Sequence, residues 1–268
     1  DFTGAVSITS GDNVTLVDTN ALVLGASNIS GALDATASGG DISQTGAITV
    51  DGAADFTAPN GNDILLGEAN TFNSTVSFLS GGTLVNVTVQ DTTAFAVEAL
   101  TITGLLDITA PSIDVTGAVS ADSIDFDAAV GAGAITDTGG SLDVATTSAL
   151  AAQATDDITL DTAGNDFTGA VSITSGDNVT LVDTNAITLG AATVSGLYDV
   201  TADAIDVTGA VSANSLDLNA AGGAGDITDT GGSVDVATTS ILAAQATDAI
   251  TLDAAGNDFT GAVSITSG

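Results

Sequence analysis

The sequence contains no lysine, arginine, histidine, cysteine, methionine or tryptophan. Without cationic side chains it cannot neutralise phosphates, so nucleic-acid binding lacks its main favourable term, and an anionic membrane surface repels it. Without histidine, cysteine or lysine, Ser-His-Asp, Cys-His and lysine-assisted catalysis are excluded. Without cysteine there is no disulfide and no thiolate metal site.

Long uncharged apolar runs are also missing, which argues against a membrane-spanning helix. Neither a signal peptide nor an initiator methionine opens the sequence, which predicts an internal piece of a longer chain. The complete loss of Lys and Arg fits a large secreted surface protein that resists trypsin-like proteases, and compositional drift of a repeat is an equally simple explanation.

The charge that remains is acidic: 34 Asp and Glu residues give a net charge of −34, and only Glu68 and Glu98 are not Asp. The hydrophobic fraction of 44% is too high for a disordered acidic tail. We therefore expect a folded domain with a core.

Internal repetition is the strongest feature of the sequence. The segment DFTGAVSITSG occurs at residues 1–11, 166–176 and 258–268, at separations of 165 and 92 residues. Since a 92-residue unit is too long for one structural repeat, a shorter period must divide it. About 18.3 residues divides 92, 165 and their difference into five, nine and four whole turns.

A series of polar residues follows this period with steps of about 18 to 19 residues, and each is preceded by an apolar or aromatic residue. The series is Asp107, Asp125, Asp143, Asp161, Thr180, Asp199, Asp217, Asp235 and Asp253. Alternation of apolar and polar residues indicates strands with one buried face. Ser-Gly-Asp-Asn and Asp-Thr-Asn between them favour tight turns.

These patterns predict an all-β fold, a parallel β-helix (β-solenoid) with about 18 to 19 residues per coil. We expect one continuous solenoid over residues 1–268, with a 92-residue super-repeat of five coils that is clearest from 106 to 268. Residues 148–154 and their copy 240–246 are expected as strand or loop, with a short helix as the alternative. Neither end should carry a cap. The residues predicted to stack in one interior wall are Leu142, Leu160, Leu216, Val234 and Leu252.

The segments GNDFTGAVSIT (164–174), DNVTLVDTNAITLGA (177–191) and GDISQTGAITVDGAADFTA (40–58) resemble repeats of filamentous-haemagglutinin-like exoproteins, giant bacterial surface adhesins. The resemblance covers nearly the whole chain. It implies a β-helical shaft that is exported to the bacterial cell surface and is extracellular.

The candidate site is a ladder of carboxylates. If the coils follow this period, these acids stack about 4.8 Å apart on one outward wall, where neighbours repel by about 0.9 kcal/mol in water and about 3.5 kcal/mol at an effective dielectric of 20. The side chains can splay into solvent, share protons, or bind cations such as Ca²⁺. The candidate metal ligands are Asp107, Asp125, Asp143, Asp161, Asp199, Asp217, Asp235 and Asp253.

Other chemistry is less well supported by the sequence. A two-carboxylate glycosidase needs one irregular acid cluster, whereas these acids recur monotonously. The segment GGAGDITDT (222–230) places its Asp one position too early for a calcium-binding nonapeptide.

The sequence therefore favours a non-catalytic structural shaft or filament of a secreted adhesin, with no required cofactor. A cation-binding extracellular matrix or coat protein is the alternative. An ice-binding solenoid would need regular Thr pairs that Asp interrupts here. The expected partners are further copies or neighbouring repeats stacked end to end, and a host-surface or matrix glycan or protein.

Overall fold

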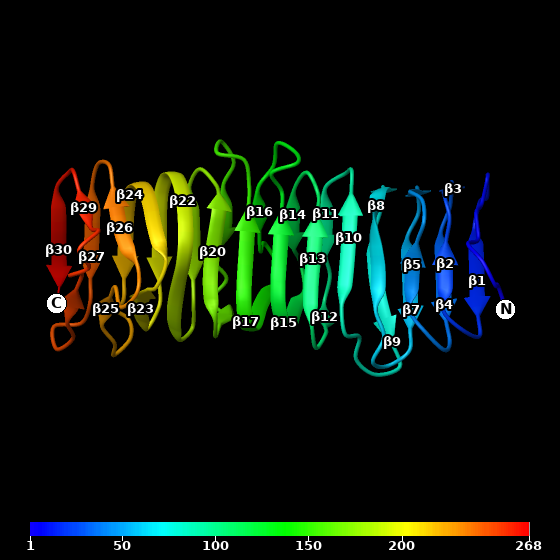
Figure 1. Cartoon of the computed structure of the whole chain (residues 1–268), viewed down its shortest axis with the longest axis horizontal. Helices are drawn as coiled ribbons and strands as arrows, with labels where there is room; N and C mark the ends of the chain where they lie inside the picture. The colour runs from blue at the N-terminus through cyan, green and yellow to red at the C-terminus, as the bar shows by residue number, and fades with distance from the viewer. Residues whose placement is uncertain (268) are drawn as a thin grey trace.

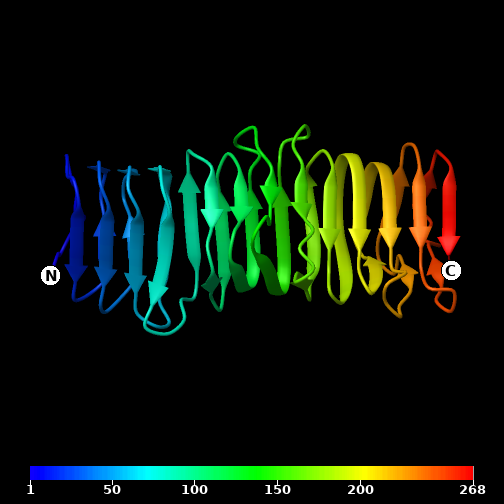
Figure 2. The ribbon, with the colours of Figure 1, turned by 180° about the vertical axis from the view of Figure 1, so that it is seen from behind.

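The computed structural model describes residues 1–267 and shows a rod in which the chain winds as a parallel β-solenoid (Figure 1). The colours run in sequence order from one end to the other, so each coil stacks on the one before it (Figure 2). There are about 12 turns of about 21 residues each. The predicted fold class is confirmed, and the predicted coil length is too short.

Two long ladders of parallel strands run along the rod. We call the first wall 1; its strands pair one after another in chain order. They are β2 (Leu22–Leu24), β5 (Ile42–Gln44), the start of β8 (Ile64–Phe72), β10 (Val87–Asp91), β13 (Leu105–Thr109), the ends of β15 (Ala118–Asp127) and β17 (Ser141–Ala151), β20 (Ala170–Ser175), the start of β22 (Ala186–Thr201), β23 (Ala204–Val207), β25 (Ile227–Thr228) and β28 (Ile250–Thr251).

Wall 2 comprises two ladders of parallel strands. Its N-terminal part is a four-stranded sheet of β1 (Val14–Asp18), β4 (Leu33–Ala37), β7 (Ala54–Ala58) and β9 (Val76–Ser80). The second part comprises β11 (Phe95–Val97), β14 (Ile113–Val115), β16 (Ile135–Thr136), β18 (Ile158–Leu160), β21 (Val179–Val182), the ends of β22 and β24 (Ala210–Asn219), β27 (Ser240–Ala243) and β30 (Val263–Ser267).

The remaining short strands, which we call the third wall, pair in three groups along the rod. The end strands are β3 (Ser27–Ile29), β6 (Ile48–Val50), the end of β8, the middle of β22, the start of β24, β26 (Ser233–Val236) and β29 (Asp258–Phe259); the middle strands are β12 (Leu100–Thr101), the starts of β15 and β17, and β19 (Asp166–Phe167).

The pairing of the strands explains the 92-residue repeat. From Ile135 in wall 2, four turns of strand pairing lead to Leu216, and the next of the three strands in a turn contains Ile227, the counterpart of Ile135 in the next copy of the repeat. The repeat therefore spans four turns and one of the three strands of the next turn. The predicted five turns are wrong, because whole turns were assumed, whereas similar walls also allow a fraction of a turn.

Turns differ in length because loops between the strands differ. Phe95 stacks on Ile113 through a short turn, and Ile124 stacks on Ser148 through a longer one: the residue numbers differ by 18 (95 to 113) and by 24 (124 to 148). Two loops near the middle protrude from the rod (Figure 1). Extra residues bulge outward there without changing the strand ladder, so no fixed period describes the coils.

The core is a narrow column of mostly aliphatic side chains with a few aromatic ones. Leu142, Leu160, Leu216 and Val234 are buried as predicted, and Leu252 is partly buried. They do not stack on one another as predicted, because Leu142 follows Val119 in its ladder, while Leu160 pairs with Leu181.

Every element of residues 1–267 is a strand, including β17 and β27, where a short helix was the alternative. No helix long and apolar enough to cross a membrane occurs in this range. Within it, neither terminal turn carries a separate cap.

Tyr198 is a polar exception within the core. It stacks between Val179 and Leu216, and its hydroxyl has no hydrogen-bond partner. A buried hydroxyl without a partner costs about 1–3 kcal/mol. We expect Tyr198→Phe to raise the free energy of unfolding by about 1 kcal/mol in urea denaturation. The reverse change at a buried position, Phe126→Tyr, should lower it; a Tyr198→Phe variant less stable than the parent would contradict this.

Candidate functional site: the stacked carboxylates

The structure breaks the predicted acidic ladder into short pieces. Asp107 stacks directly on Asp125, and Asp199 stacks on Asp217, each pair through one short turn. The next residues in these two columns are Ala149 and Ile241, not acids. The eight candidate ligands therefore do not form one continuous row.

The other four candidates lie elsewhere. Asp143 stacks on Asp166, and Asp235 on Asp258, in the third wall. Asp161 and Asp253 follow strands β18 and β28 and are exposed. The longer turns at these points move each acid out of the predicted column.

The two stacked pairs are electrostatically strained. Partial burial, followed by the charges of Asp125 and Asp127, raises the pKa of Asp107 above its ordinary value. Burial and then Asp127 raise the pKa of Asp125. Burial and then Asp217 raise the pKa of Asp199, and burial raises that of Asp217. No Lys or Arg exists to relieve them.

A second group of acids, which the sequence did not lead us to predict, is buried and accepts hydrogen bonds from backbone N–H groups. The carboxylate of Asp137 accepts hydrogen bonds from the N–H groups of Asp161 (3.1 Å) and Thr162 (3.1 Å) and from Asn165 Nδ2 (2.7 Å). Asn165 Oδ1 accepts from the N–H of Leu142 at 2.9 Å. This Asp–Asn pair ties three segments of neighbouring turns together.

The arrangement recurs one 92-residue repeat later. Asp229 accepts from the N–H groups of Asp253 (3.0 Å) and Ala254 (3.0 Å) and from Asn257 Nδ2 (2.6 Å). The equal spacing from Asp to Asn in two copies of ITDTGG…GND was the available signal. It is not interpretable without knowing that the two residues lie in adjacent turns.

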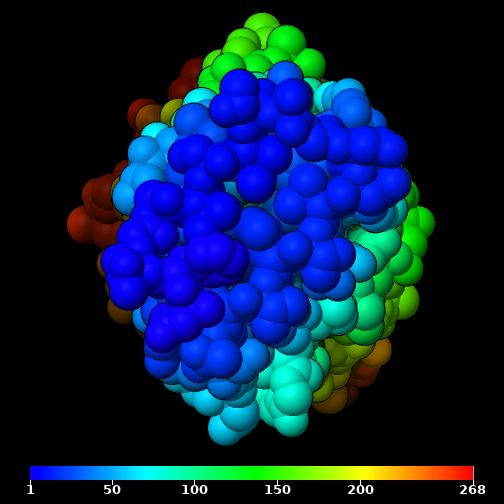
Figure 3. All heavy atoms as spheres, turned by 90° about the vertical axis from the view of Figure 1, so that its right-hand side faces the viewer, coloured from blue at the N-terminus to red at the C-terminus, as the bar shows by residue number. Residues whose placement is uncertain are grey.

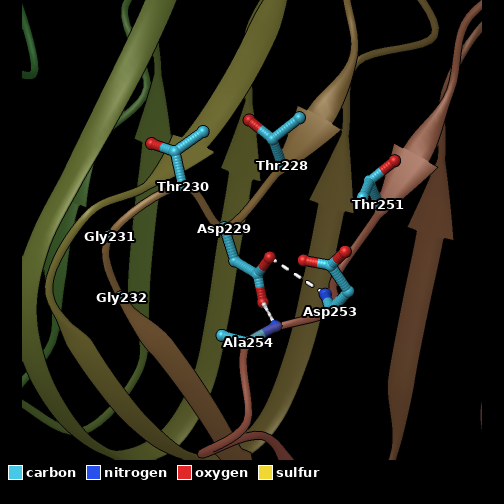
Figure 4. A pocket seen from close by; sticks show the side chains of 8 residues that line it. All are labelled: Thr228, Asp229, Thr230, Gly231, Gly232, Thr251, Asp253 and Ala254. Atoms are coloured by element: carbon cyan, nitrogen blue, oxygen red, sulfur yellow. Dashed lines mark hydrogen bonds between the residues drawn. The ribbon is translucent and has the colours of Figure 1, made fainter.

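A hollow of about 380 Å³ lies at this second copy (Figure 4). Thr228, Thr230 and Thr251 border it, and Asp229 and Asp253 lie side by side in it. The carboxylate of Asp229 is already occupied by N–H groups of the chain itself. The hollow therefore offers hydroxyls and the exposed Asp253 carboxylate to solvent.

Two further acids are held by threonine. Asp114 accepts from Thr138 Oγ1 (2.7 Å), Thr138 N (3.0 Å) and Thr136 Oγ1 (2.9 Å). Although partial burial acts to raise it, these hydrogen bonds lower the pKa of Asp114 below its ordinary value. Its copy Asp206 is held in the same way, with its pKa lowered in the same sense.

Within residues 1–267, no group of three or more acidic side chains lies close enough to surround one metal ion. The pairs Asp107–Asp125 and Asp199–Asp217 are what the structure retains of the predicted ladder. Calcium binding at them stays a prediction.

The pKa shifts predict the pH dependence of stability. For Asp107, Asp125, Asp199 and Asp217 the folded pKa lies above the ordinary value of 3.8, so their unfavourable contribution grows as pH rises through the folded pKa and vanishes in acid. For Asp114 and Asp206 the folded pKa is lowered, so their contribution is lost only as pH falls below 3.8. We expect the melting temperature to be highest at about pH 4 to 5 and lower at pH 7. A melting temperature that rises steadily from pH 4 to pH 8 would contradict this.

The stacked coils define the class of protein as a β-solenoid built from repeats. A family model described as "Repeats of unknown function (DUF5649)" matches residues 11–79, 116–174, 176–224 and 209–266, which together make up most of the chain. The chain belongs to this family of repeats. No curated protein and no solved structure matches it.

Proposed function

We propose that this chain is a structural shaft of a secreted bacterial surface adhesin and that it carries no catalytic site. The observation that supports this most directly is the hydrophobic column from Leu16 to Leu242, enclosed by parallel ladders over the length of the rod. About 12 turns correspond to a rigid spacer about 60 Å long.

The hydrogen bonding of the buried acids and the arrangement of the exposed acids support the same proposal. The most buried carboxylates that have polar partners include those of Asp137 and Asp229, which bind backbone N–H groups. The exposed acids recur by repetition, as the stacked pairs Asp107–Asp125 and Asp199–Asp217 do, whereas a two-carboxylate hydrolase uses one irregular pair. Such a surface keeps a long secreted rod soluble because like charges repel neighbouring rods.

Exchange of the shaft in the producing bacterium tests this function. Replacing residues 1–268 by an unrelated β-solenoid of equal length should leave cell adhesion unchanged, whereas deleting them should shorten the surface projection by about 60 Å. Antibodies against the chain should label intact cells. Loss of adhesion after the exchange would mean that this surface itself binds the ligand, and labelling only after permeabilisation would refute surface exposure.

The stacked pairs support the second candidate, a cation-binding extracellular coat. Melting of the chain in millimolar CaCl₂ should be compared with melting in NaCl of matched ionic strength. Screening alone raises both midpoints equally, because it weakens repulsion among the acids. A larger rise in calcium that disappears in an Asp107→Asn/Asp199→Asn variant would identify the pairs as the site; an equal rise would remove specific calcium binding.

A further inference from the structure

The coils are incompletely paired at one point along the rod. Wall 1 is continuous there, because β8 pairs with β10 and β10 with β13. The other two walls are interrupted: among the strands of residues 1–267, β9 pairs with β7 alone, and no pair joins β8 to β12. We call this interruption the seam. It lies between residues 73–83 of one turn and residues 94–101 of the next.

Contacts close the seam at both of its ends. At one end Thr93 Oγ1 donates to the carbonyl oxygen of Phe72 at 2.9 Å. At the other end Leu84 and Ile102 form an isolated parallel bridge. Between these points the described part of the chain has no backbone hydrogen bond from one side of the seam to the other. The seam lies in the cyan part of the rod, away from both terminal turns (Figure 1).

One side of the seam is an unpaired strand edge. The N–H of Ala54 donates to the carbonyl oxygen of Thr75, so in this parallel pair residues 77 and 79 direct their backbone groups toward β7. The backbone N–H and C=O of Phe78 therefore face the seam. An edge of this kind is a template for pairing with a further strand.

The missing neighbour also leaves apolar surface uncovered. Phe78 stacks on Phe56 of the preceding turn, with ring centroids 6.3 Å apart. Phe56 is fully buried, whereas Phe78 is only partly buried and Leu79 beside it is 48% exposed. A strand in the seam would cover Phe78 as β9 covers Phe56.

Three hollows follow one another along the seam. The first, of about 460 Å³, lies between residues 72–75 and Thr93. Two smaller ones, of about 120 Å³ and 250 Å³, share Phe78, Leu79 and Leu100. A cavity of about 150 Å³ holds a benzene-sized group, so the seam has room for an apolar side chain of an incoming strand.

The charge at the seam favours a cationic occupant. Glu98 lines the seam beside Phe78, and Ser77 Oγ donates to its carboxylate at 3.4 Å. The chain has no Lys, Arg or His, so it offers Glu98 no cationic side chain. A second copy of the chain carries the same charge of −34, and repulsion between copies disfavours it as the occupant.

The seam is a local feature and not a property of the repeated coil. Residues 80–115, which include the loop after β9 and the far side of the seam, are the longest internal stretch outside the matches to the repeat family. The loop after β9 reaches beyond the neighbouring turns (Figure 2). In the view along the rod, cyan atoms of this region project past the outline of the N-terminal turns (Figure 3).

We propose that the seam binds an extended peptide segment of another protein, in which apolar residues alternate with a lysine or arginine. The segment pairs with the free edge of β9 through the backbone of Phe78. It places an apolar side chain in the hollow between Phe78 and Leu100 and directs its cation to Glu98. β9 is five residues long, which sets the length of the paired segment. The inference goes beyond the proposed shaft function and does not depend on it.

A capped, fluorescein-labelled peptide of sequence Thr-Val-Lys-Val-Thr tests the proposal. Its binding to the whole chain is measured by fluorescence anisotropy, and we expect saturable binding. The same peptide with every backbone nitrogen methylated keeps the charge and the side chains but loses the N–H donors of a strand. It should bind at least about tenfold more weakly, because main-chain hydrogen bonds supply much of the affinity of an added strand. No binding of the parent peptide, or equal binding of the methylated one, would overturn the proposal.

Two variants of the chain separate the seam from the general acidity of the surface. Glu98→Gln should weaken binding about fivefold, because it removes the partner of the peptide lysine. Glu68→Gln removes an equal charge from an exposed position of β8 and should change binding by less than about twofold. Equal effects of the two variants would show that the peptide is held by net charge alone and would refute the seam as its site.

Hydrogen exchange measures the pairing directly. The Phe78 amide should exchange more slowly when the peptide is bound, because its N–H becomes hydrogen-bonded. An unchanged rate at saturation would contradict pairing with β9.

Sedimentation of the chain without peptide tests the other occupant. We expect a monomer at this surface. Self-association that Leu79→Asp abolishes would overturn the proposal by identifying a second copy as the occupant of the seam.

Discussion

Replacing Gly169 by alanine is expected to lower the free energy of unfolding by about 3 kcal/mol. Gly169 begins the turn into β20, and a Cβ placed there would overlap the carbonyl oxygen of Thr146 in the preceding turn. The backbone dihedrals of Gly169 are open to any residue, because the only positive φ among the residues described belongs to Gly61. The loss would therefore report on the close approach of two coils.

Gly222→Ala is the matched control, since no atom lies within 4 Å of its Cβ position. It should change the free energy of unfolding by less than about 1 kcal/mol. Gly261, which meets Thr238 in the same way one repeat later, should behave like Gly169. Urea denaturation followed by circular dichroism measures all three. Equal stability of the Gly169→Ala and Gly222→Ala variants would show that the coils are not packed as described.

Replacing Asp137 by alanine should also lower the free energy of unfolding by about 3 kcal/mol. Asp137 is 2% exposed, and its removal leaves the N–H groups of Asp161 and Thr162 and the Asn165 amide without their acceptor. Each buried donor without a partner costs about 1–3 kcal/mol. The effect should be transmitted to the next turn, since Asn165 also orients the N–H of Leu142.

Asp143→Ala removes an equal charge from the surface and should be neutral or slightly stabilising, because it relieves repulsion in an acidic chain. Asp137→Asn retains one acceptor oxygen and should fall between the two alanine variants. An Asp137→Ala variant as stable as Asp143→Ala would show that the Asp137–Asn165 bridge does not hold the turns together.

Part of the acidic ladder could be predicted from the sequence, because some loops between successive turns have the predicted length. Thr88, Asp107 and Asp125 stack as expected, as do Thr180, Asp199 and Asp217, because the turns between them are short and match the predicted period. Where the loops are longer, the same spacing places an acid in another wall. The length of a loop decides which residue of the preceding turn the next strand pairs with. The alternation of apolar and polar residues within a strand does not depend on loop length, so it does not predict that partner.

The displacement of the repeat by a fraction of a turn was hidden for a related reason. Two similar walls let a copied segment fold in either of them, so identical sequences such as Ile135-Thr136 and Ile227-Thr228 lie in different ladders. A search restricted to whole turns rejects the correct period.

The sequence alone determined the class of fold, the aliphatic core and the acidic character of the surface. The fold class, the core and the surface charge depend on which residue types alternate along a strand and which residue types are absent. Both properties are visible within a single strand of the sequence. Only the tertiary structure decided which acids stack and that Asp137 and Asp229 are buried. Those features depend on contacts between successive turns of unequal length, such as Phe95 with Ile113 and Ile124 with Ser148, where the intervening loops set the partner of each residue.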